Sequence, residues 1–318
     1  MIDVLCMGRS SIDLYAHEIG VPITGVRSFD AYVGGCPANV SVGTRRLGLK
    51  SALLTAVGTD QVGDFVLDFL RREGVEVGFV PRIAERRTSA ALLTIDPPDR
   101  FPLTFYRDNC ADLGLTLDHV GAAPLAESRM VFLSGTGLSE EPSRTATLFA
   151  GESARALGAT VVVDLDYRQS LWPSASAFGV NVRTLLARAD MAIGTVEEVV
   201  AATGAADAMT GASSLLAAGL PVLILKRGAD GAVVCRRGDE PVPVAPFKIE
   251  VLNVLGAGDA FASGFLYGYV QGWTLEEAAR FGNATGAIVV TRHGCANFMP
   301  TLPEVHDFFE AQGAALPR

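Results

Sequence analysis

Residues 130–163, MVFLSGTGLSEEPSRTATLFAGESARALGATVVV, contain two short apolar runs separated by a stretch with helical spacing. The runs at 130–133 and 160–163 have the length and composition of buried strands, whereas 144–157 has the spacing of an amphipathic helix. A strand, a helix and a second strand in this order predict two parallel strands with the helix packed against their sheet.

The same alternation extends through most of the chain. Further strands are predicted at 4–7, 52–57, 191–193 and 222–225, and further helices at 38–47, 62–73, 196–202, 259–271 and 275–291. This pattern indicates the α/β class, with a mostly parallel central sheet covered by helices on both faces. Because no repeat or linker divides the chain, residues 1–318 are predicted to form a single domain.

Two segments interrupt the alternation, at about 13–33 and 87–108. Both contain alternating polar and apolar residues with Gly and Pro turns, which is typical of antiparallel strands inserted into the α/β body. A small additional sheet of this kind either covers a cleft or is an ordinary edge hairpin, and the pattern alone leaves both interpretations open.

Composition excludes several classes of protein. The 318 residues are 49% hydrophobic and carry 26 Lys and Arg against 35 Asp and Glu, a net charge of −9. Disordered, collagen-like and coiled-coil proteins differ from this profile, and no basic stretch indicates nucleic-acid binding. The longest apolar stretch, around 215–225, is too short to span a membrane, and no secretory signal is visible, so a cytoplasmic location is expected. Five scattered cysteines and four histidines predict neither a disulfide framework nor a structural metal.

The first motif that indicates chemistry is NVLGAGDAF at 253–261. Its glycine-rich turn directly precedes a predicted helix, so backbone N–H groups at the helix N-terminus are expected to bind an anion. Asp259 would then lie close enough to a bound phosphate to accept a proton from an attacking alcohol. Taken alone, the motif also fits a glycine turn in which Asp259 is an ordinary helix cap.

A second motif, GGCPANVS, occupies 34–41. Gly34 and Gly35 would let a polyhydroxy ligand approach the backbone, and Asn39 offers both a donor and an acceptor. As an isolated feature this motif also fits a tight strand-to-helix turn.

Together these motifs resemble the ribokinase-like (pfkB-type) carbohydrate kinases. The resemblance also includes Gly8 and Asp13 after the first strand and KRGADG at 226–231, so it covers essentially the whole chain. It implies a three-layer α/β/α sandwich in which the inserted strands form a lid over a sugar. It also implies ATP and Mg²⁺ as cofactors and a homodimer formed through the lid strands.

The resemblance assigns expected roles to matching residues. It implies that Asp259 is the general base, that the backbone of Gly256, Ala257 and Gly258 forms an anion hole, and that Asp13, Gly34, Gly35 and Asn39 hold sugar hydroxyls. Lys226, Gly228, Gly231 and Asn283 are expected to contact the nucleotide.

Two departures from the family pattern limit these expectations. Thr195 stands where the family has asparagine in its nucleotide-binding motif, although Glu198 keeps the carboxylate linked through water to Mg²⁺. Asn253 and Val254 replace the usual Asp-Thr, which removes a carboxylate that supports a monovalent-cation site, so potassium activation is not expected.

Two arginines indicate the substrate class. Arg107 and Arg168 correspond to cleft positions in the branch of the family that phosphorylates keto-deoxy sugar acids, and a guanidinium suits a carboxylate. Surface salt bridges are the alternative role for this pair. Segments 107–112 and 291–300 most resemble enzymes of inositol catabolism, which implies phosphorylation of the C6 hydroxyl of 5-dehydro-2-deoxygluconate. The alternatives are 2-keto-3-deoxygluconate, fructose, and a non-enzymatic sugar-acid sensor.

Overall fold

The computed structural model describes residues 1–95 and 101–317 and contains a central sheet of eight strands. The strand order is β14-β13-β12-β11-β10-β9-β1-β4, and all neighbours from β12 to β4 pair in parallel. The strands are β1 (Ile2–Met7), β4 (Ser51–Leu54), β9 (Ser128–Ser134), β10 (Thr160–Asp164), β11 (Met191–Thr195), β12 (Val222–Lys226), β13 (Ala232–Arg236) and β14 (Val242–Val244). The last two strands are antiparallel and form one edge.

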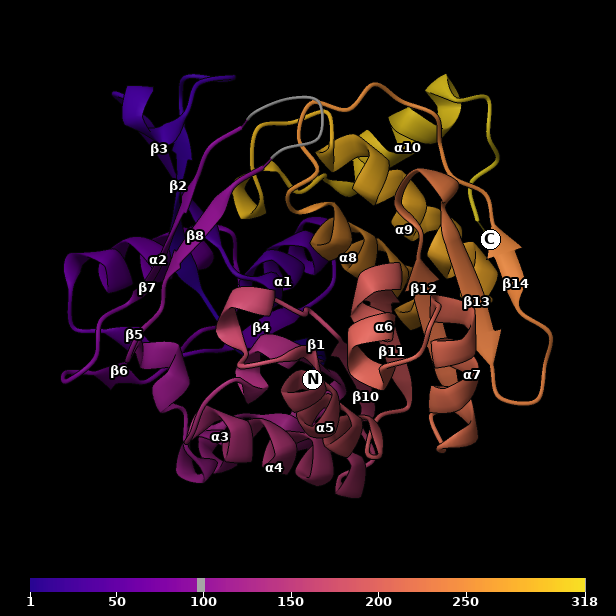
Figure 1. Ribbon diagram of the computed structural model, residues 1–318, viewed down its shortest axis with the longest axis horizontal. Coiled ribbons are helices and arrows are strands. Elements are labelled where there is room, and N and C mark those ends of the chain that lie inside the picture. The colour runs from indigo at the N-terminus through magenta and orange to yellow at the C-terminus, as the bar shows by residue number, and fades with distance from the viewer. Residues whose placement is uncertain (96–100, 318) are drawn as a thin grey trace.

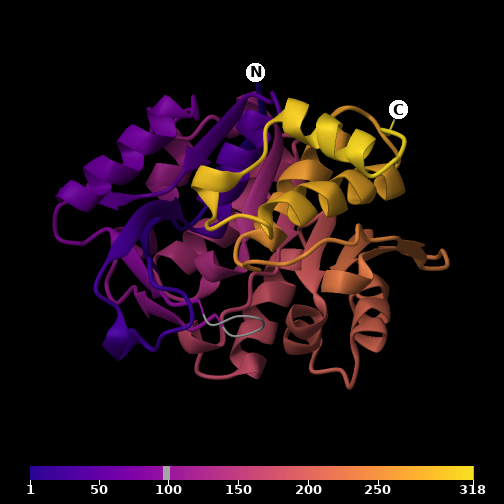
Figure 2. The ribbon, with the colours of Figure 1, turned by 90° about the horizontal axis from the view of Figure 1, so that it is seen from above.

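Helices cover both faces of this sheet, which confirms the predicted three-layer arrangement (Figure 1). One face carries α3 (Leu117–Ala122), α4 (Ser143–Ala156), α5 (Ala175–Leu186), α6 (Val196–Thr203) and α7 (Ala208–Ala217). The other carries α1 (Cys36–Arg46), α2 (Gln61–Arg72), α8 (Ala257–Val270) and α9 (Leu275–Val289). Helix α10 (Leu302–Ala311) packs on α9 through Phe281 and Phe309 (Figure 2). Among the residues described, no helix has the length and apolar character needed to cross a bilayer.

The inserted segments form a separate four-stranded sheet, here called the lid sheet, at one side of the molecule (Figure 1). Its order is β3 (Phe29–Gly34), β2 (Ser11–Ala16), β7 (Ser89–Leu93) and β8 (Leu103–Tyr106). The expectation of purely antiparallel strands is wrong, because the central pair β2 and β7 is parallel. These two strands are joined by a long connection that contains α1 and α2, which permits parallel pairing. Residues 96–100 of the predicted insert at 87–108 lie outside the described residues.

Other parts of the predicted element pattern also differ from the structure. Strands β13 and β14 are absent from the predicted set. The strand predicted at 52–57 ends at Leu54, and Val57–Gly58 form β5, which pairs with β6 (Arg82–Ile83) in a small second sheet. Helices α3, α5, α7 and α10 are absent from the predicted set. All four begin at side chains suited to helix N-caps, namely Thr116, Ser174, Asp207 and Thr301.

The C-terminal segment fastens the lid sheet to the body. The Tyr15 hydroxyl and the Cys295 thiol are hydrogen-bonded at 2.7 Å, and the Val33 N–H donates to Asn297 Oδ1 at 3.0 Å. The rings of Tyr32 and Phe298 meet edge to face, with centroids 5.2 Å apart. Strands β2 and β3 are therefore held by residues more than 260 positions later in the chain.

Candidate functional site

A small cavity lies between the lid sheet and the carboxyl ends of the parallel strands. It brings together six predicted site residues: Asp13, Gly35, Asn39, Arg168, Gly256 and Asp259. On the side of the lid sheet, the cavity is lined by Leu93 of β7 and by Leu103 and Phe105 of β8. The lid sheet therefore forms one wall of the site. The cavity has a volume of about 40 Å³.

Asp259 lies in the first turn of α8 and is held by α1. Gly256 precedes the helix with φ +83°, a left-handed conformation that favours glycine, and a Cβ there would lie 3.2 Å from the Cys295 backbone. Asn39 Nδ2 donates to Asp259 Oδ2 at 2.6 Å, which fixes one carboxylate oxygen. The N–H of Ala257 already donates to Val254 O at 3.3 Å, whereas Gly258 is among the first amides of the helix, which have no intrahelical acceptor.

The two adjacent glycines make room for other parts of the protein. A Cβ on Gly34 would lie 1.9 Å from Asp13 Oδ2, and one on Gly35 would lie 2.4 Å from the Arg9 carbonyl oxygen. Gly35 lines the cavity, whereas the space beside Gly34 is filled by the Asp13 carboxylate. Burial raises the pKa of Asp13 above its ordinary value, although Arg9 and a hydrogen bond from Ser11 oppose this shift.

Replacing Gly34 by alanine is expected to displace Asp13 from the cavity, since backbone geometry puts the added methyl group on its carboxylate. If Asp13 binds sugar hydroxyls, as the family resemblance implies, its displacement is expected to lower kcat/KM for the sugar by about 10²-fold, while the KM for ATP changes little. Steady-state kinetics with each substrate varied measures both values. Gly121→Ala is the matched control, because nothing lies within 4 Å of a Cβ there. Unchanged sugar kinetics in Gly34→Ala would contradict this role for Asp13.

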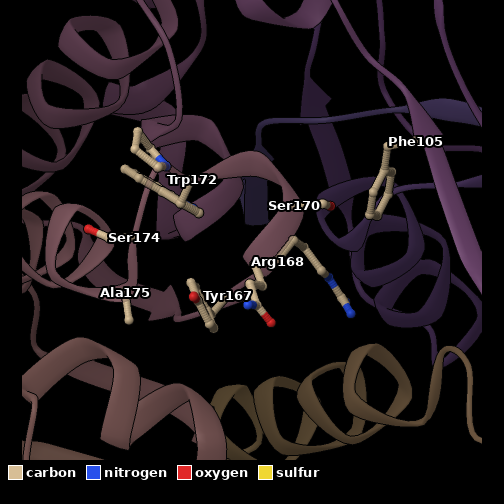
Figure 3. Close-up of a pocket in the computed structure, with 9 residues that line it drawn as sticks. Phe105, Tyr167, Arg168, Ser170, Trp172, Ser174 and Ala175 are labelled. Atoms are coloured by element: carbon tan, nitrogen blue, oxygen red, sulfur yellow. The ribbon is translucent and has the colours of Figure 1, made fainter.

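Arg168 links the cavity to a larger open pocket. Its Nε donates to Asp166 Oδ1 at 2.9 Å, and Asp166 in turn accepts hydrogen bonds from Ser134 and Thr136. Asp166 raises the pKa of the Arg168 guanidinium, so the arginine stays charged. The open pocket has a volume of about 760 Å³, with Phe105 and Arg168 on one side and Trp172 on the other (Figure 3).

Arg107 does not line this cavity. Its side chain is 3% exposed, and both Nε and Nη2 donate to Asp112 Oδ2, at 2.9 and 2.6 Å. Nη1 donates to the Thr136 carbonyl and to Ser139 Oγ. The structure therefore brings Arg168, but not Arg107, to the predicted substrate cleft.

A cluster of charges extends from the cavity toward the end of β12. Lys226 Nζ lies 3.1 Å from Asp164 Oδ2 and close to Gly258, where an added Cβ would be 3.2 Å away. Burial raises the pKa of Asp164 to about 7 against the opposing effect of Lys226, and Glu198, Asp166 and Asp259 add to the rise. Burial lowers the pKa of the Lys226 ammonium, but the surrounding carboxylates, Asp164 first, outweigh it and keep the pKa above its ordinary value.

Thr195 and Glu198 form a capping box at the start of α6. The Thr195 N–H donates to Glu198 Oε2 at 2.7 Å, and the Glu198 N–H donates to Thr195 Oγ1 at 3.3 Å. Glu198 therefore has a defined position next to the Lys226 cluster. This position suits a carboxylate that acts on a ligand through water.

The pKa of Asp164 makes the stability of the protein depend on pH. Because its native pKa of about 7 exceeds the ordinary 3.8, the native state holds a proton that the unfolded chain releases between these values. The free energy of unfolding therefore falls as pH rises through this window, by up to about 1.4 kcal/mol per pH unit. We expect Asp164→Asn to lose this component of the slope between about pH 5 and about pH 7, as measured by urea unfolding at each pH. Exposed Asp68→Asn should keep the parent slope, and an unchanged slope in Asp164→Asn would contradict the shift.

Three predicted nucleotide contacts, Gly228, Gly231 and Asn283, lie near the ends of β12 and β14. Gly228 and Gly231 flank the turn after β12 with φ of +57° and +79°, and a Cβ on Gly231 would lie 2.3 Å from Val244 O. Asn283 on α9 donates to the carbonyls of Val244 and Ala245, at 3.3 and 2.9 Å. Gly231 and Asn283 thus both pack against the chain that follows β14.

The cavity also contains residues that are not among the predicted set. Arg9, Tyr15, Cys36 and Cys295 line it together with Leu255. Arg9 directly follows Gly8 at the end of the first strand, and this position at a parallel strand's carboxyl end was the available signal.

The fold is that of an α/β enzyme, and its cavity lies beneath an inserted sheet at the carboxyl ends of parallel strands, where such enzymes bind small molecules. The chain belongs to the pfkB family of carbohydrate kinases, whose profile matches residues 1–302. It is an ATP-dependent carbohydrate kinase, as its sequence motifs predict.

Similar proteins cover almost the whole chain. The 5-dehydro-2-deoxygluconokinase of Shouchella clausii is 36% identical over 322 residues, covering 98% of this chain and 96% of that protein. The enzyme of the same name from Geobacillus thermodenitrificans is 33% identical, covering 99% of this chain and 95% of that protein. Among solved structures, Xylella fastidiosa fructokinase with bound ATP has a TM-score of 0.88 and 28% identity, covering 98% of this chain and 99% of that chain.

Proposed function

We propose that this protein transfers the γ-phosphate of ATP to the C6 hydroxyl of 5-dehydro-2-deoxy-D-gluconate, in inositol catabolism. The observation that carries the proposal is the 33–36% identity, over nearly the full chain, to proteins named for this reaction. The charged Arg168 in the cavity that contains Asp259 supports an anionic substrate. Residues 1–318 would act as one kinase domain.

The reacting groups have defined roles in this proposal. Asp259 accepts the proton of the C6 hydroxyl as the hydroxyl oxygen attacks the γ-phosphorus of ATP. The bond between that phosphorus and the leaving oxygen of ADP breaks. Asn39 orients Asp259, and the start of α8, at Gly256, Ala257 and Gly258, stabilises the negative charge of the transferring phosphoryl group.

The remaining contacts divide between the two ligands. Asp13 and the backbone of Gly35 bind hydroxyl groups of the sugar acid, and Gly34 leaves space for Asp13. Lys226 neutralises phosphate charge, and Thr195, Gly228, Gly231 and Asn283 shape the nucleotide side.

Mg²⁺ fits the carboxylates beside Lys226. Asp166, Glu198 and Asp259 lie close enough to Asp164 to raise its pKa, and carboxylate oxygens of this kind suit Mg²⁺. Within residues 1–95 and 101–317, no three His, Cys, Asp or Glu side chains could hold a metal directly, which fits an ion that keeps its waters and binds triphosphate. Bound Mg²⁺ would offset phosphate charge, and Glu198 would hold it through water. Because Asn253 is neutral, we propose that potassium gives no activation.

The test is ADP release with ATP, Mg²⁺ and a panel of 5-dehydro-2-deoxygluconate, 2-keto-3-deoxygluconate, fructose and ribose. We expect the highest kcat/KM for 5-dehydro-2-deoxygluconate. Preference for 2-keto-3-deoxygluconate would keep the reaction class and overturn the substrate, and turnover of neutral sugars alone would overturn an acid substrate. No turnover of any compound would favour a sugar-acid sensor.

We also propose a homodimer paired through the lid sheet. Its two outer strands expose Phe29 and Tyr106, which are 37% and 59% accessible. Apolar side chains on edge strands favour pairing with another chain. Sedimentation that gives a monomer at working concentration would overturn the dimer.

Five buried free thiols support a reducing compartment such as the cytoplasm.

A further inference from the structure

Arg9 is a charged side chain inside the sugar cavity that the proposed reaction has not used. It lies in the turn between β1 and β2 and is 7% exposed. It lines the same cavity as Asp13, Arg168 and Asp259. The Phe105 ring lies over its guanidinium, with 5.0 Å between the ring centroid and Cζ.

The hydrogen bonds of Arg9 leave donors available. Nη1 donates to Ser11 Oγ at 2.8 Å, and Ser11 Oγ donates to Asp13 Oδ1 at 2.6 Å. Nε is buried and has no hydrogen-bond partner in the structure. Within the described part of the chain, no carboxylate forms an ion pair with Arg9, although a buried guanidinium normally has such a partner.

Arg168 faces the same cavity with donors of its own. Among the described residues only its Nε forms a hydrogen bond, the one to Asp166, so its two terminal nitrogens are available to a ligand. Arg9 and Arg168 both act on the charges of Asp13 and Asp166, which places the two guanidinium groups around one small region.

Arg107 contrasts with this pair, because the Asp112 carboxylate and the carbonyl and hydroxyl oxygens of residues 136 and 139 occupy its donors. A ligand carboxylate would have to break a buried ion pair to reach it, which is costly. A carboxylate that enters the cavity instead meets Arg9, which forms no direct ion pair with any described carboxylate, although Asp13 and Asp166 lie close enough to interact with its charge.

We infer that Arg9, together with Arg168, forms the subsite for the substrate carboxylate. This inference rests on the proposed function, since it requires a sugar acid as substrate. The carboxylate supplies a direct ion-pair partner for Arg9, while Asp13, linked to Arg9 through Ser11, remains available for hydroxyl groups. Arg9 therefore determines specificity for acids over neutral sugars and takes no part in proton transfer.

The experiment compares the parent with Arg9→Gln and Arg9→Lys, using ADP release with 5-dehydro-2-deoxygluconate. Arg9→Gln is expected to raise the KM for the sugar acid about tenfold to a hundredfold, the loss expected for a charge-assisted hydrogen bond. The KM for ATP and kcat should stay within about threefold, because neither depends on the carboxylate. Arg9→Lys keeps the charge but not the planar fork, so its KM should lie between those of the parent and Arg9→Gln. The exposed Arg72→Gln is the matched control, with a side chain that is 68% accessible.

The outcomes separate this inference from the proposed function. A sugar-acid KM within about twofold of the parent in Arg9→Gln would overturn the role of Arg9. An equal rise in the sugar-acid KM of Arg9→Gln and Arg9→Lys would overturn it too. A parent that phosphorylates only neutral sugars would overturn the proposed function itself, and with it the carboxylate subsite. If Arg9→Gln does not fold, Arg9→Lys is the test. A sugar-acid KM equal to that of the parent in Arg9→Lys would show that the planar guanidinium of Arg9 does not bind the substrate carboxylate.

Discussion

Asp259→Asn is expected to lower kcat by about 10² to 10⁴-fold, the range for loss of a general base. The substitution keeps the size of the side chain. The Asn39 side-chain amide can flip, so that its Oδ1 accepts a hydrogen bond from the new amide group at position 259. This flip breaks no other hydrogen bond of Oδ1, because among the described residues this buried atom has no partner. The cavity and the nucleotide side keep their shape, so the KM values for the sugar acid and ATP should stay within about threefold.

Steady-state kinetics on the purified variant measures this effect. Asp68→Asn is a suitable control, because this carboxylate on α2 is 66% exposed and pairs with the exposed Arg72. A fall in kcat of less than about tenfold in Asp259→Asn would show that another group takes the proton.

Arg107→Gln is expected to lower the free energy of unfolding by about 3–5 kcal/mol, because it leaves Asp112 as a buried charge without its partner. The side chain of Asp112 is fully buried, and Oδ2 receives both hydrogen bonds from Arg107. The substitution also removes the donor to Ser139 and the Thr136 carbonyl, which join the segment after β8 to the end of β9.

Urea unfolding followed by circular dichroism measures this loss. The surface variant Arg72→Gln should change the unfolding free energy by less than about 0.5 kcal/mol. A similarly small change in Arg107→Gln would mean that the buried pair contributes no net stability. The comparison thus shows how much the buried Arg107–Asp112 pair stabilises the fold relative to an exposed arginine.

The parts of the fold that could be predicted from sequence depend on local patterns. The alternating strands and helices follow from apolar runs and helical spacing, and the position of Asp259 follows from a glycine turn before a helix. The antiparallel edge was also accessible, because residues 227–231 between β12 and β13 are too few for a parallel crossover. Helices α5 and α7 are rich in small residues, so their apolar faces contrast weakly with their polar faces.

The choice among arginines could not be made from sequence in the same way. Arg9, Arg107 and Arg168 all follow strands, and each could reach a cleft at the strand ends. Which of them faces a ligand depends on whether a carboxylate in the folded chain occupies its donors. Asp112 accepts hydrogen bonds from Nε and Nη2 of Arg107, whereas among the described residues Asp166 accepts one from Arg168, through its Nε. The partners come from turns whose conformation is set by tertiary packing.

The attachment of the lid sheet to the C-terminal segment has a consequence for folding in the cell. Tyr15 and Cys295 are 280 residues apart, and Val33 and Asn297 are 264 apart. At roughly 5–20 residues per second, the ribosome adds Cys295 on the order of tens of seconds after Tyr15. Asn39 likewise waits for Asp259, 220 residues later. Strands β2 and β3 therefore emerge early but complete their packing late, so that nearly the whole polypeptide must be synthesised before this cavity can form.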